Sequence, residues 1–347
     1  MEYDTREKIE PLGILDPEIA AFLAGRPAAS LGAEDDEVQK MMEKAKAEQT
    51  SRPDSSTEYS IHIPMRDGYQ SETRIHKPES PSGDKHPLIV LIYGGGFVMG
   101  HCTQLSPYAR IAAKVFNAVV VNISYRLAPV HKFPAAPNDA WDSLKWIAAN
   151  AHTLGADPYA GFILGGASAG GNLAAVVAQK SVDEGLTPPL TGTWLCIPYL
   201  LEEEIVPPKY KDVWFSREQN AAGPVIDKDG MAHMKAAYGA DVKSPDLSPF
   251  NSKNPHKGLP PTFLQVCGTD PLRDDGLVYD RVLREHGVKT KLVVYPGAPH
   301  GHIMFPSKLS TKSHFDTFDG LAWLLGKETP DEEVITQELA LNPIMSV

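Results

Sequence analysis

Six short apolar segments recur along the middle and end of this chain. They lie at residues 87–93, 118–124, 161–164, 191–197, 262–267 and 291–295. A continuous apolar run bounded by turn residues is typical of a strand buried on both faces. Helical patterns separate most of these runs, at residues 108–116, 136–151, 172–183 and 277–286. This alternation predicts an α/β fold, with a mostly parallel sheet covered on both faces by helices.

Two segments before the first apolar run have a different pattern. Residues 59–64 and 71–76 alternate apolar and polar side chains, and Asp67-Gly68 lies in the turn between them. Such alternation predicts an antiparallel hairpin with one face exposed to water. With the six apolar runs, the hairpin predicts a sheet of eight strands.

Two further regions predict a cover over the sheet. Residues 16–24 begin with Asp and Pro, a helix-start signal, and residues 37–46 have an amphipathic helical pattern. The long irregular stretch after Pro198 contains Trp214 and Phe215, which favour a packed lid. We therefore expect N-terminal cap helices in residues 1–50, a cap insertion in residues 199–248, and a catalytic α/β domain in residues 51–198 and 249–347.

Composition narrows the class of protein. The formal net charge of -11 argues against a nucleic-acid-binding surface. No apolar stretch reaches the ~18 residues of a membrane span, and the charged N-terminus lacks the apolar core of a secretion signal. Cys102, Cys196 and Cys267 are scattered, which favours a reducing compartment. These features predict a cytoplasmic protein without stable membrane insertion.

The segment Gly166-Ala167-Ser168-Ala169-Gly170 joins a predicted buried strand to a predicted helix. This is the G-x-S-x-G pattern of a nucleophile elbow, in which a sharp turn exposes the serine hydroxyl. The turn is so tight that the residues two before and two after the serine must be small. A turn of small residues with nothing reactive in it has the same pattern. The decision therefore depends on whether a base, an acid and an oxyanion hole accompany Ser168.

Asp270 and His300 each follow a later predicted strand closely. Ligands of open α/β sheets bind at this carboxyl edge, so the two side chains and Ser168 are expected to meet there. A serine hydroxyl needs a base to take its proton, and an acid to orient that base. We therefore predict a catalytic triad of Ser168, Asp270 and His300.

Other side chains near these positions are alternatives. His302 is a second candidate base, and His300 is preferred because it lies nearer the end of its strand. Asp274 and Asp275 are further carboxylates, but their place at the start of a predicted helix favours an interaction with the helix dipole.

Three consecutive glycines, Gly94, Gly95 and Gly96, follow the first apolar run. Glycines lose much conformational entropy on folding, so a run of them indicates a special backbone requirement. Here they allow backbone N–H groups to approach a substrate oxyanion, together with the amide of Ala169 just after the nucleophile. We predict that these four residues form the oxyanion hole.

The combined motifs resemble the hormone-sensitive-lipase-like family of α/β-hydrolases. The resemblance runs from about residue 57 to 326 and is carried by five ordered segments, namely Gly94–Phe97, Ser124–Pro129 with Phe133–Ala136, Gly166–Asn172, Asp270–Gly276 and Tyr295–Gly301. It implies an α/β-hydrolase fold with a helical cap, a serine carboxylesterase activity on small-molecule esters, and a tendency to form homodimers. It also implies that Tyr125 and Arg126 have a structural role at a strand end.

Three positions depart from this family's usual pattern. Tyr93 stands where a histidine usually precedes the glycines, Ala167 where aspartate is common, and Val130 where glutamate is common. None of the three is a predicted triad member. The polar groups that the family usually has at these positions are absent here, so the hydrogen bonding of the oxyanion loop is expected to differ.

The expected activity is hydrolysis of small or short-acyl esters, including those of secondary metabolites, through an acyl-enzyme. The aromatic residues expected to contact substrate are Phe97, Trp214, Phe215 and Phe305. An amidase, formamidase or lactonase of the same family is an alternative, as is a non-hydrolytic dehydratase, cyclase or small-molecule receptor. Receptor forms tend to lose the histidine that is present here as His300. The chemistry requires no cofactor or metal, and the histidines lack metal-ligand spacing.

Overall fold

The eight predicted strands form one sheet. The computed structural model describes residues 2–24, 43–44, 47, 50, 54–79 and 85–342. Apart from residues 43 and 44, the helix expected at 37–46 lies outside this part of the chain. The strands are β1 (Glu58–Pro64), β2 (Gln70–His76), β3 (Leu88–Ile92), β4 (Val119–Ile123), β5 (Phe162–Ala167), β6 (Gly192–Cys196), β7 (Thr262–Cys267) and β8 (Thr290–Tyr295).

The strand order is β1-β2-β4-β3-β5-β6-β7-β8. β1 pairs antiparallel with β2, and β2 antiparallel with β4, whereas the remaining neighbours are parallel. The side chains of β3 and β4 are buried throughout, as their unbroken apolar runs predict. The predicted α/β fold with a mostly parallel eight-stranded sheet is therefore confirmed.

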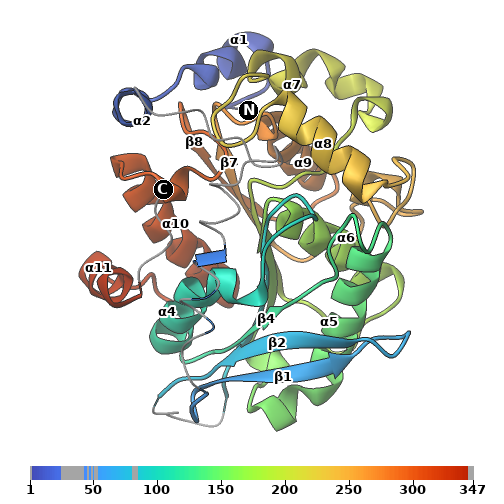
Figure 1. The fold of residues 1–347 in the computed structure, drawn as a ribbon, viewed down its shortest axis with the longest axis vertical. Helices are drawn as coiled ribbons and strands as arrows, with labels where there is room; N and C mark the ends of the chain where they lie inside the picture. Colours follow the sequence, from blue (N-terminus) through green and yellow to red (C-terminus); the bar gives the residue numbers. More distant parts are fainter. Residues whose placement is uncertain are drawn as a thin grey trace.

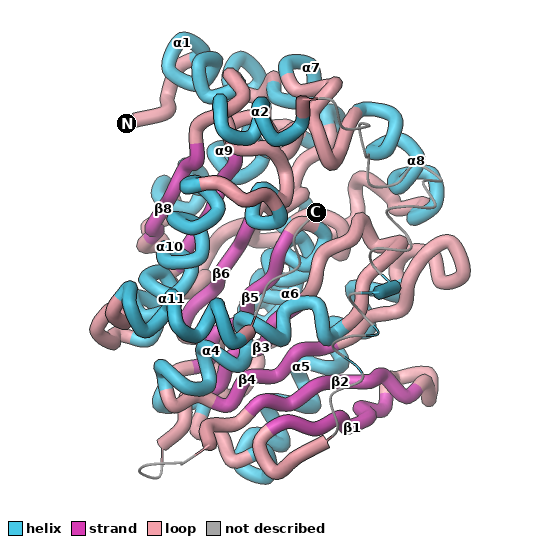
Figure 2. The backbone as a smooth tube through the Cα atoms, turned by 60° about the vertical axis from the view of Figure 1, so that its left-hand side comes forward, coloured by secondary structure: helices cyan, strands magenta, loops and turns pink. Residues whose placement is uncertain are grey.

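Helices cover both faces of the sheet (Figures 1 and 2). A Cβ atom built on Gly320 would lie 2.1 Å from the ring of Phe263, and one on Gly276 would lie 2.6 Å from the side chain of Val266. Residues 263 and 266 point to opposite faces of β7, so α10 and α9 lie on opposite sides. The main helices are α4 (Ser106–Phe116), α5 (Ala135–Leu154), α6 (Ala169–Asp183), α9 (Arg273–Glu285), α10 (Lys308–Leu325) and α11 (Glu332–Leu341).

Four other helices gather at one end of the molecule (Figure 1). They are α1 (Arg6–Ile9), α2 (Pro17–Leu23), α7 (Ser216–Gln219) and α8 (Lys228–Tyr238). Asp16 caps α2, because its carboxylate accepts hydrogen bonds from the amides of Glu18 and Ile19. The helix start predicted from Asp16-Pro17 is therefore present.

The N-terminal segment is attached to the loop that follows β8. The amide of Gly297 donates to the carbonyl of Leu12 at 2.9 Å, and the amide of Asp16 donates to the carbonyl of Gly297 at 3.0 Å. Gly297 has a φ of +73°, and a Cβ there would approach the carbonyl of Ile14 at 2.6 Å. A glycine is therefore required where the two segments meet.

The close contact between α10 and β7 generates a stability prediction. Alanine forms helices more readily than glycine, by about 1 kcal/mol. Gly320→Ala is nevertheless expected to lower the free energy of unfolding by about 1–3 kcal/mol, because its methyl group overlaps the ring of Phe263. Urea denaturation measures the change. In a Phe263→Ala background the same substitution should be neutral or stabilising, and an equal loss in both backgrounds would contradict the steric explanation.

Candidate active site

Ser168 occupies a strained turn between β5 and α6. Its φ of 55° and ψ of -119° lie in a region that residues other than glycine rarely adopt. A Cβ on Gly166 would lie 2.2 Å from the carbonyl oxygen of Gly170, and one on Gly170 would lie 2.1 Å from that of Ile92. The small residues of the motif are therefore required by backbone contacts, as a nucleophile elbow demands.

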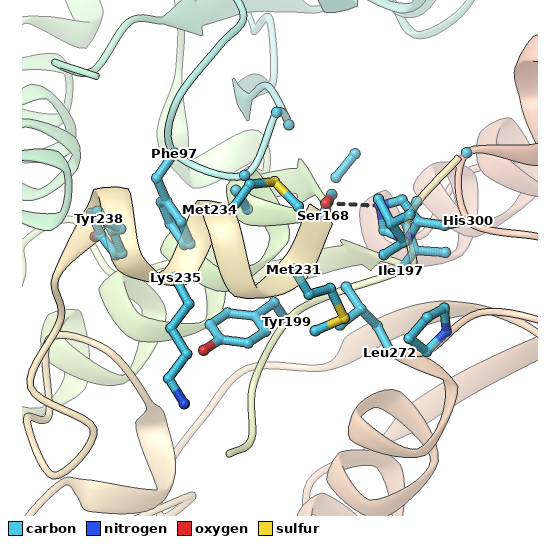
Figure 3. A pocket seen from close by; sticks show the side chains of 18 of the residues that line it. Phe97, Ser168, Ile197, Tyr199, Met231, Met234, Lys235, Tyr238, Leu272 and His300 are labelled. Atoms are coloured by element: carbon cyan, nitrogen blue, oxygen red, sulfur yellow. Dashed lines mark hydrogen bonds between the residues drawn. The ribbon is translucent and has the colours of Figure 1, made fainter. Parts of the chain in front are cut away.

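A row of hydrogen bonds connects three side chains from separate loops, and Figure 3 shows the bond between Ser168 and His300. The Nε2 atom of His300 lies 2.9 Å from Ser168 Oγ, and its Nδ1 atom lies 2.7 Å from Asp270 Oδ2. The other carboxylate oxygen of Asp270 accepts a 2.7 Å hydrogen bond from the amide of Leu272. Asp270 and His300 are buried. The structure thus brings together the three residues predicted as a triad.

His302, the alternative base, lies in a different environment. Its Nδ1 atom is 3.1 Å from the sulfur of Cys267, and its ring centroid is 4.9 Å from that of Tyr295. Burial, with smaller contributions from nearby histidines, lowers the pKa of His302 to about 3. This neutral ring packs against Cys267 and Tyr295 at the ends of β7 and β8, whereas His300 is hydrogen-bonded to Ser168, so His300 is the histidine placed to act on the serine.

The glycine loop lies beside Ser168. A Cβ on Gly94 would be 3.1 Å from the Cβ of Ser168, and Gly95 and Gly96 have φ values of +126° and +59°. Within the described part of the chain, the amides of Gly95, Gly96 and Ala169 donate to no other protein group. Free amides around a serine hydroxyl are the arrangement that stabilises a developing oxyanion.

Ser168 lies in the wall of a cavity of about 650 Å³. Glu202 and Lys235 also line it and form a 2.6 Å ion pair. The other lining side chains are mostly apolar, including Phe97, Ile197, Tyr199, Met231, Met234 and Leu272 (Figure 3). An apolar cavity with a few polar groups is typical of a small-molecule site.

A family model described as the α/β-hydrolase fold matches residues 89–304. The chain belongs to the α/β-hydrolase family. This match, together with relatives that are named as esterases, confirms the family predicted from the motifs, in its carboxylesterase-like branch, and with it the prediction of a carboxylesterase-type hydrolase.

Similar proteins cover most of this hydrolase. An AB hydrolase superfamily protein of Schizosaccharomyces pombe is 35% identical over 329 residues, covering 92% of this chain and 96% of its own length. Versiconal hemiacetal acetate esterase of Dothistroma septosporum is 35% identical over 257 residues, which cover 73% of this chain and 78% of that esterase. Among solved structures, vibralactone cyclase superposes with a TM-score of 0.82 at 31% identity, covering 92% of this chain and 97% of its own.

Tyr93, which replaces the usual histidine, is held by a reciprocal contact. Its hydroxyl donates to the carbonyl of Tyr125, and the hydroxyl of Tyr125 donates to the carbonyl of Tyr93, both at 3.2 Å. The two rings stack with centroids 4.4 Å apart. Arg126, the next residue, forms two side-chain hydrogen bonds with Asp139. In this hydrolase the glycine loop is therefore anchored by a tyrosine pair.

Ala167 and Val130, the other two positions that differ from the family's usual residues, lie in different environments. Ala167 ends β5, and its carbonyl oxygen would be 2.9 Å from a Cβ on Gly94. Val130 is 82% exposed, so the apolar replacement is in contact with solvent.

Only two of the four aromatic residues predicted to contact substrate line the cavity. Phe97 and Trp214 line the cavity, whereas Phe215 and Phe305 are absent from its lining. Phe215 is buried beneath the guanidinium of Arg6, whose central carbon is 4.3 Å from the ring. Phe305 packs edge-on against a phenylalanine of α2, with ring centroids 5.9 Å apart. Phe305 packs in one cluster with Leu272, which lines the cavity, and so supports the cavity wall from behind, whereas Phe215 belongs to the main hydrophobic core.

Asp274 and Asp275 have a structural role that their sequence pattern does not reveal. Asp274 accepts 2.6 Å hydrogen bonds from two successive amides, those of Phe215 and Ser216. Asp275 accepts from the amides of Leu200 and Leu201. Asp275 also accepts from the side chains of Trp214 and Arg217. These carboxylates fasten the segment after β6 to α9, whereas the sequence suggested only a helix-dipole contact.

The carboxylate of Asp275 provides a prediction for the stability of the segment after β6. Burial raises its pKa, although Arg217 and the two backbone amides act in the opposite direction. Asp275→Leu is expected to lower the free energy of unfolding by about 3–5 kcal/mol, because it leaves buried donors and the Arg217 guanidinium without an acceptor. Denaturant titration measures this loss. The exposed Asp229→Asn is the matched control, and equal stability of both variants would contradict the role given to Asp275.

Proposed function

We propose that this hydrolase cleaves short-acyl carboxylic esters through a covalent acyl-enzyme on Ser168. The observation that carries the proposal is the row of hydrogen bonds from Asp270 through His300 to Ser168, at the wall of an apolar cavity. The membership of the chain in the carboxylesterase-like branch supports the same reaction.

In the first half of the reaction, Ser168 Oγ attacks the ester carbonyl while His300 Nε2 takes its proton. Asp270 holds the ring through Nδ1–H and stabilises the imidazolium. His300 then donates this proton to the departing alcohol oxygen, leaving an acyl group on the serine. Water attacks the acyl-enzyme with the same histidine as base, which releases the acid and restores Ser168.

The amides of the glycine loop and Ala169 bind the negative oxygen that forms in both steps. Gly95, Gly96 and Ala169 supply N–H groups, and Gly94 allows the loop to lie close to Ser168. Donors fixed in a site that excludes water stabilise a transition state strongly, by several kcal/mol. The Tyr93–Tyr125 pair holds the start of this loop, so the loss of the family's histidine leaves the proposed oxyanion hole intact.

The proposed substrates are small esters with short acyl groups, including acetate esters of secondary metabolites. The cavity supports a modest size, since about 650 Å³ lies within the range of drug-sized ligand sites. The relative from Dothistroma septosporum, named for a hemiacetal acetate, supports an acetyl ester in particular. Phe97, Met231 and Met234 offer apolar contacts to the substrate.

The nucleophile provides the direct test. Ser168→Ala is expected to lower kcat/KM for p-nitrophenyl acetate by roughly 10⁴-fold or more, because the remaining groups cannot form an acyl-enzyme. Mass spectrometry of the wild type treated with a fluorophosphonate should place one adduct on the peptide that contains Ser168. The melting temperature shows whether the variant is folded. Full activity in a folded Ser168→Ala protein, or an adduct elsewhere, would overturn the proposal.

A second candidate function is ring closure of the acyl group. The similarity to vibralactone cyclase along nearly the whole chain favours it. A hydroxyl group of the substrate would replace water in the second step and release a lactone. Both reactions depend on Ser168, so they differ only in what attacks the acyl-enzyme.

Products formed in ¹⁸O-labelled water separate the two reactions. A hydroxyacyl ester is expected to give mainly a free acid that contains one ¹⁸O atom, because water attacks the acyl-enzyme. Mass spectrometry of the products measures this. An unlabelled lactone as the main product, formed by the wild type and absent with Ser168→Ala, would instead favour cyclisation.

Two further expectations stay predictions. Every helix in the described part of the chain is too short or too polar to cross a membrane. We propose a cytoplasmic location, which the scattered cysteines support, and a homodimer, which the family resemblance supports.

A further inference from the structure

A group of three side chains with metal-ligand chemistry lies apart from the cavity. It consists of Glu72 on β2, His101, and Cys102 at the start of a short 3₁₀ helix, η2 (Cys102–Leu105). His101 Nε2 lies 3.3 Å from Glu72 Oε2 and 4.0 Å from the sulfur of Cys102. One ligand atom from each residue lies within 4.8 Å of the other two. None of the three residues lines the cavity beside Ser168.

These distances suit a tetrahedral zinc ion. Zinc binds sulfur at about 2.3 Å and nitrogen or oxygen at about 2.0–2.2 Å, which places neighbouring ligand atoms about 3.4–3.6 Å apart. The separations from His101 Nε2 differ from this range by less than about 0.5 Å. Thiolate, imidazole and carboxylate are all zinc ligands, whereas magnesium and calcium prefer oxygen alone.

Neighbouring side chains hold the three groups in a binding arrangement. His101 Nδ1 accepts a 3.4 Å hydrogen bond from the amide of Thr103 and lies 3.1 Å from Thr103 Oγ1. When Nε2 binds a metal, the imidazole proton moves to Nδ1, which then donates to Thr103 Oγ1. Ser60 Oγ donates to Glu72 Oε1 at 3.3 Å, which leaves Oε2 directed to the histidine. Partners of this kind orient the ligands of zinc sites.

We propose that Glu72, His101 and Cys102 bind one Zn²⁺ ion, with water in the fourth position. The side chains of His101 and Glu72 are 15% and 38% exposed, so an ion reaches the site from solvent. On binding, the Cys102 thiol gives its proton to solvent, and its thiolate coordinates the metal with the neutral imidazole and the carboxylate. Cys102 itself is 1% exposed, which argues against a second nucleophile that meets substrates.

The site lies on the connection that leaves the glycine loop. Gly100 precedes it, and a Cβ there would lie 2.4 Å from the ring of Tyr93. Gln104 and Leu105, on the same short helix as Cys102, line the cavity. A bound ion therefore ties both the loop and part of the cavity wall to the hairpin strand β2.

Cobalt substitution tests the proposal through the Cys102 sulfur. Adding Co²⁺ to the metal-free full-length protein is expected to produce thiolate-to-cobalt charge-transfer absorption that saturates at one ion per chain. Zn²⁺ should displace the cobalt and remove the band. The band should be absent in Cys102→Ser. Glu72→Gln should lower the affinity by more than about 100-fold, exceeding the usual effect of losing an outer partner.

Two controls make the result specific. His152→Ala removes an exposed histidine elsewhere and should leave binding unchanged. Ser168→Ala should also bind normally, because the proposed site does not involve the nucleophile. Circular dichroism establishes that each variant is folded, and Glu72→Gln decides the matter if Cys102→Ser does not fold. Absence of one-to-one binding, or unchanged affinity in a folded Glu72→Gln variant, would overturn the proposal.

Discussion

The active-site geometry depends on how closely the start of α6 approaches the end of β3. The Cα of Gly170 lies so near the carbonyls of Ile92 and Tyr93 that a Cβ would be 2.1–2.3 Å from them. This contact forces the chain to turn sharply at Ser168 and brings Ala169 beside the glycine loop that continues from β3. One backbone contact thus positions both the nucleophile and the proposed oxyanion donors.

The acid and the segment that follows β6 are held by one short stretch of chain. Asp270 orients His300, and Asp274 and Asp275, at the beginning of α9, hold the segment that follows β6. These buried carboxylates are satisfied by backbone amides and by arginine side chains, as burial of charge requires. Stability and catalysis are therefore coupled here, because a shift of α9 moves the segment after β6 and the acid together.

Much of the fold and of the candidate site could be predicted from sequence, because those features depend on local patterns. Continuous apolar runs located the parallel strands, and Ser168, Asp270 and His300 each follow one of these strands. Phe215 and Phe305 were expected in the site, but an aromatic side chain has the same pattern whether it lines a cavity or supports its wall. Asp275 was underestimated because its hydrogen-bond donors lie about 60–75 residues earlier in the chain.

The cluster of Glu72, His101 and Cys102 could not be predicted from sequence for a similar reason. Glu72 is 29 residues before His101, so no short ligand spacing reveals that the hairpin and the glycine-loop connection meet. The antiparallel addition of β2 to β4 brings Glu72 to this position. Sequence patterns describe one element at a time, whereas these three ligands depend on the pairing of strands.

The attachment of the N-terminal segment to Gly297 has a consequence for the position of the base. Gly297 is three residues before His300, and α2 packs behind the cavity wall through Ile19, Leu272 and Phe305. A displacement of residues 12–16 would remove both hydrogen bonds from the loop that carries the base. Packing behind the cavity wall and alignment of the histidine therefore share one support, so a substitution that loosens the N-terminal segment affects both.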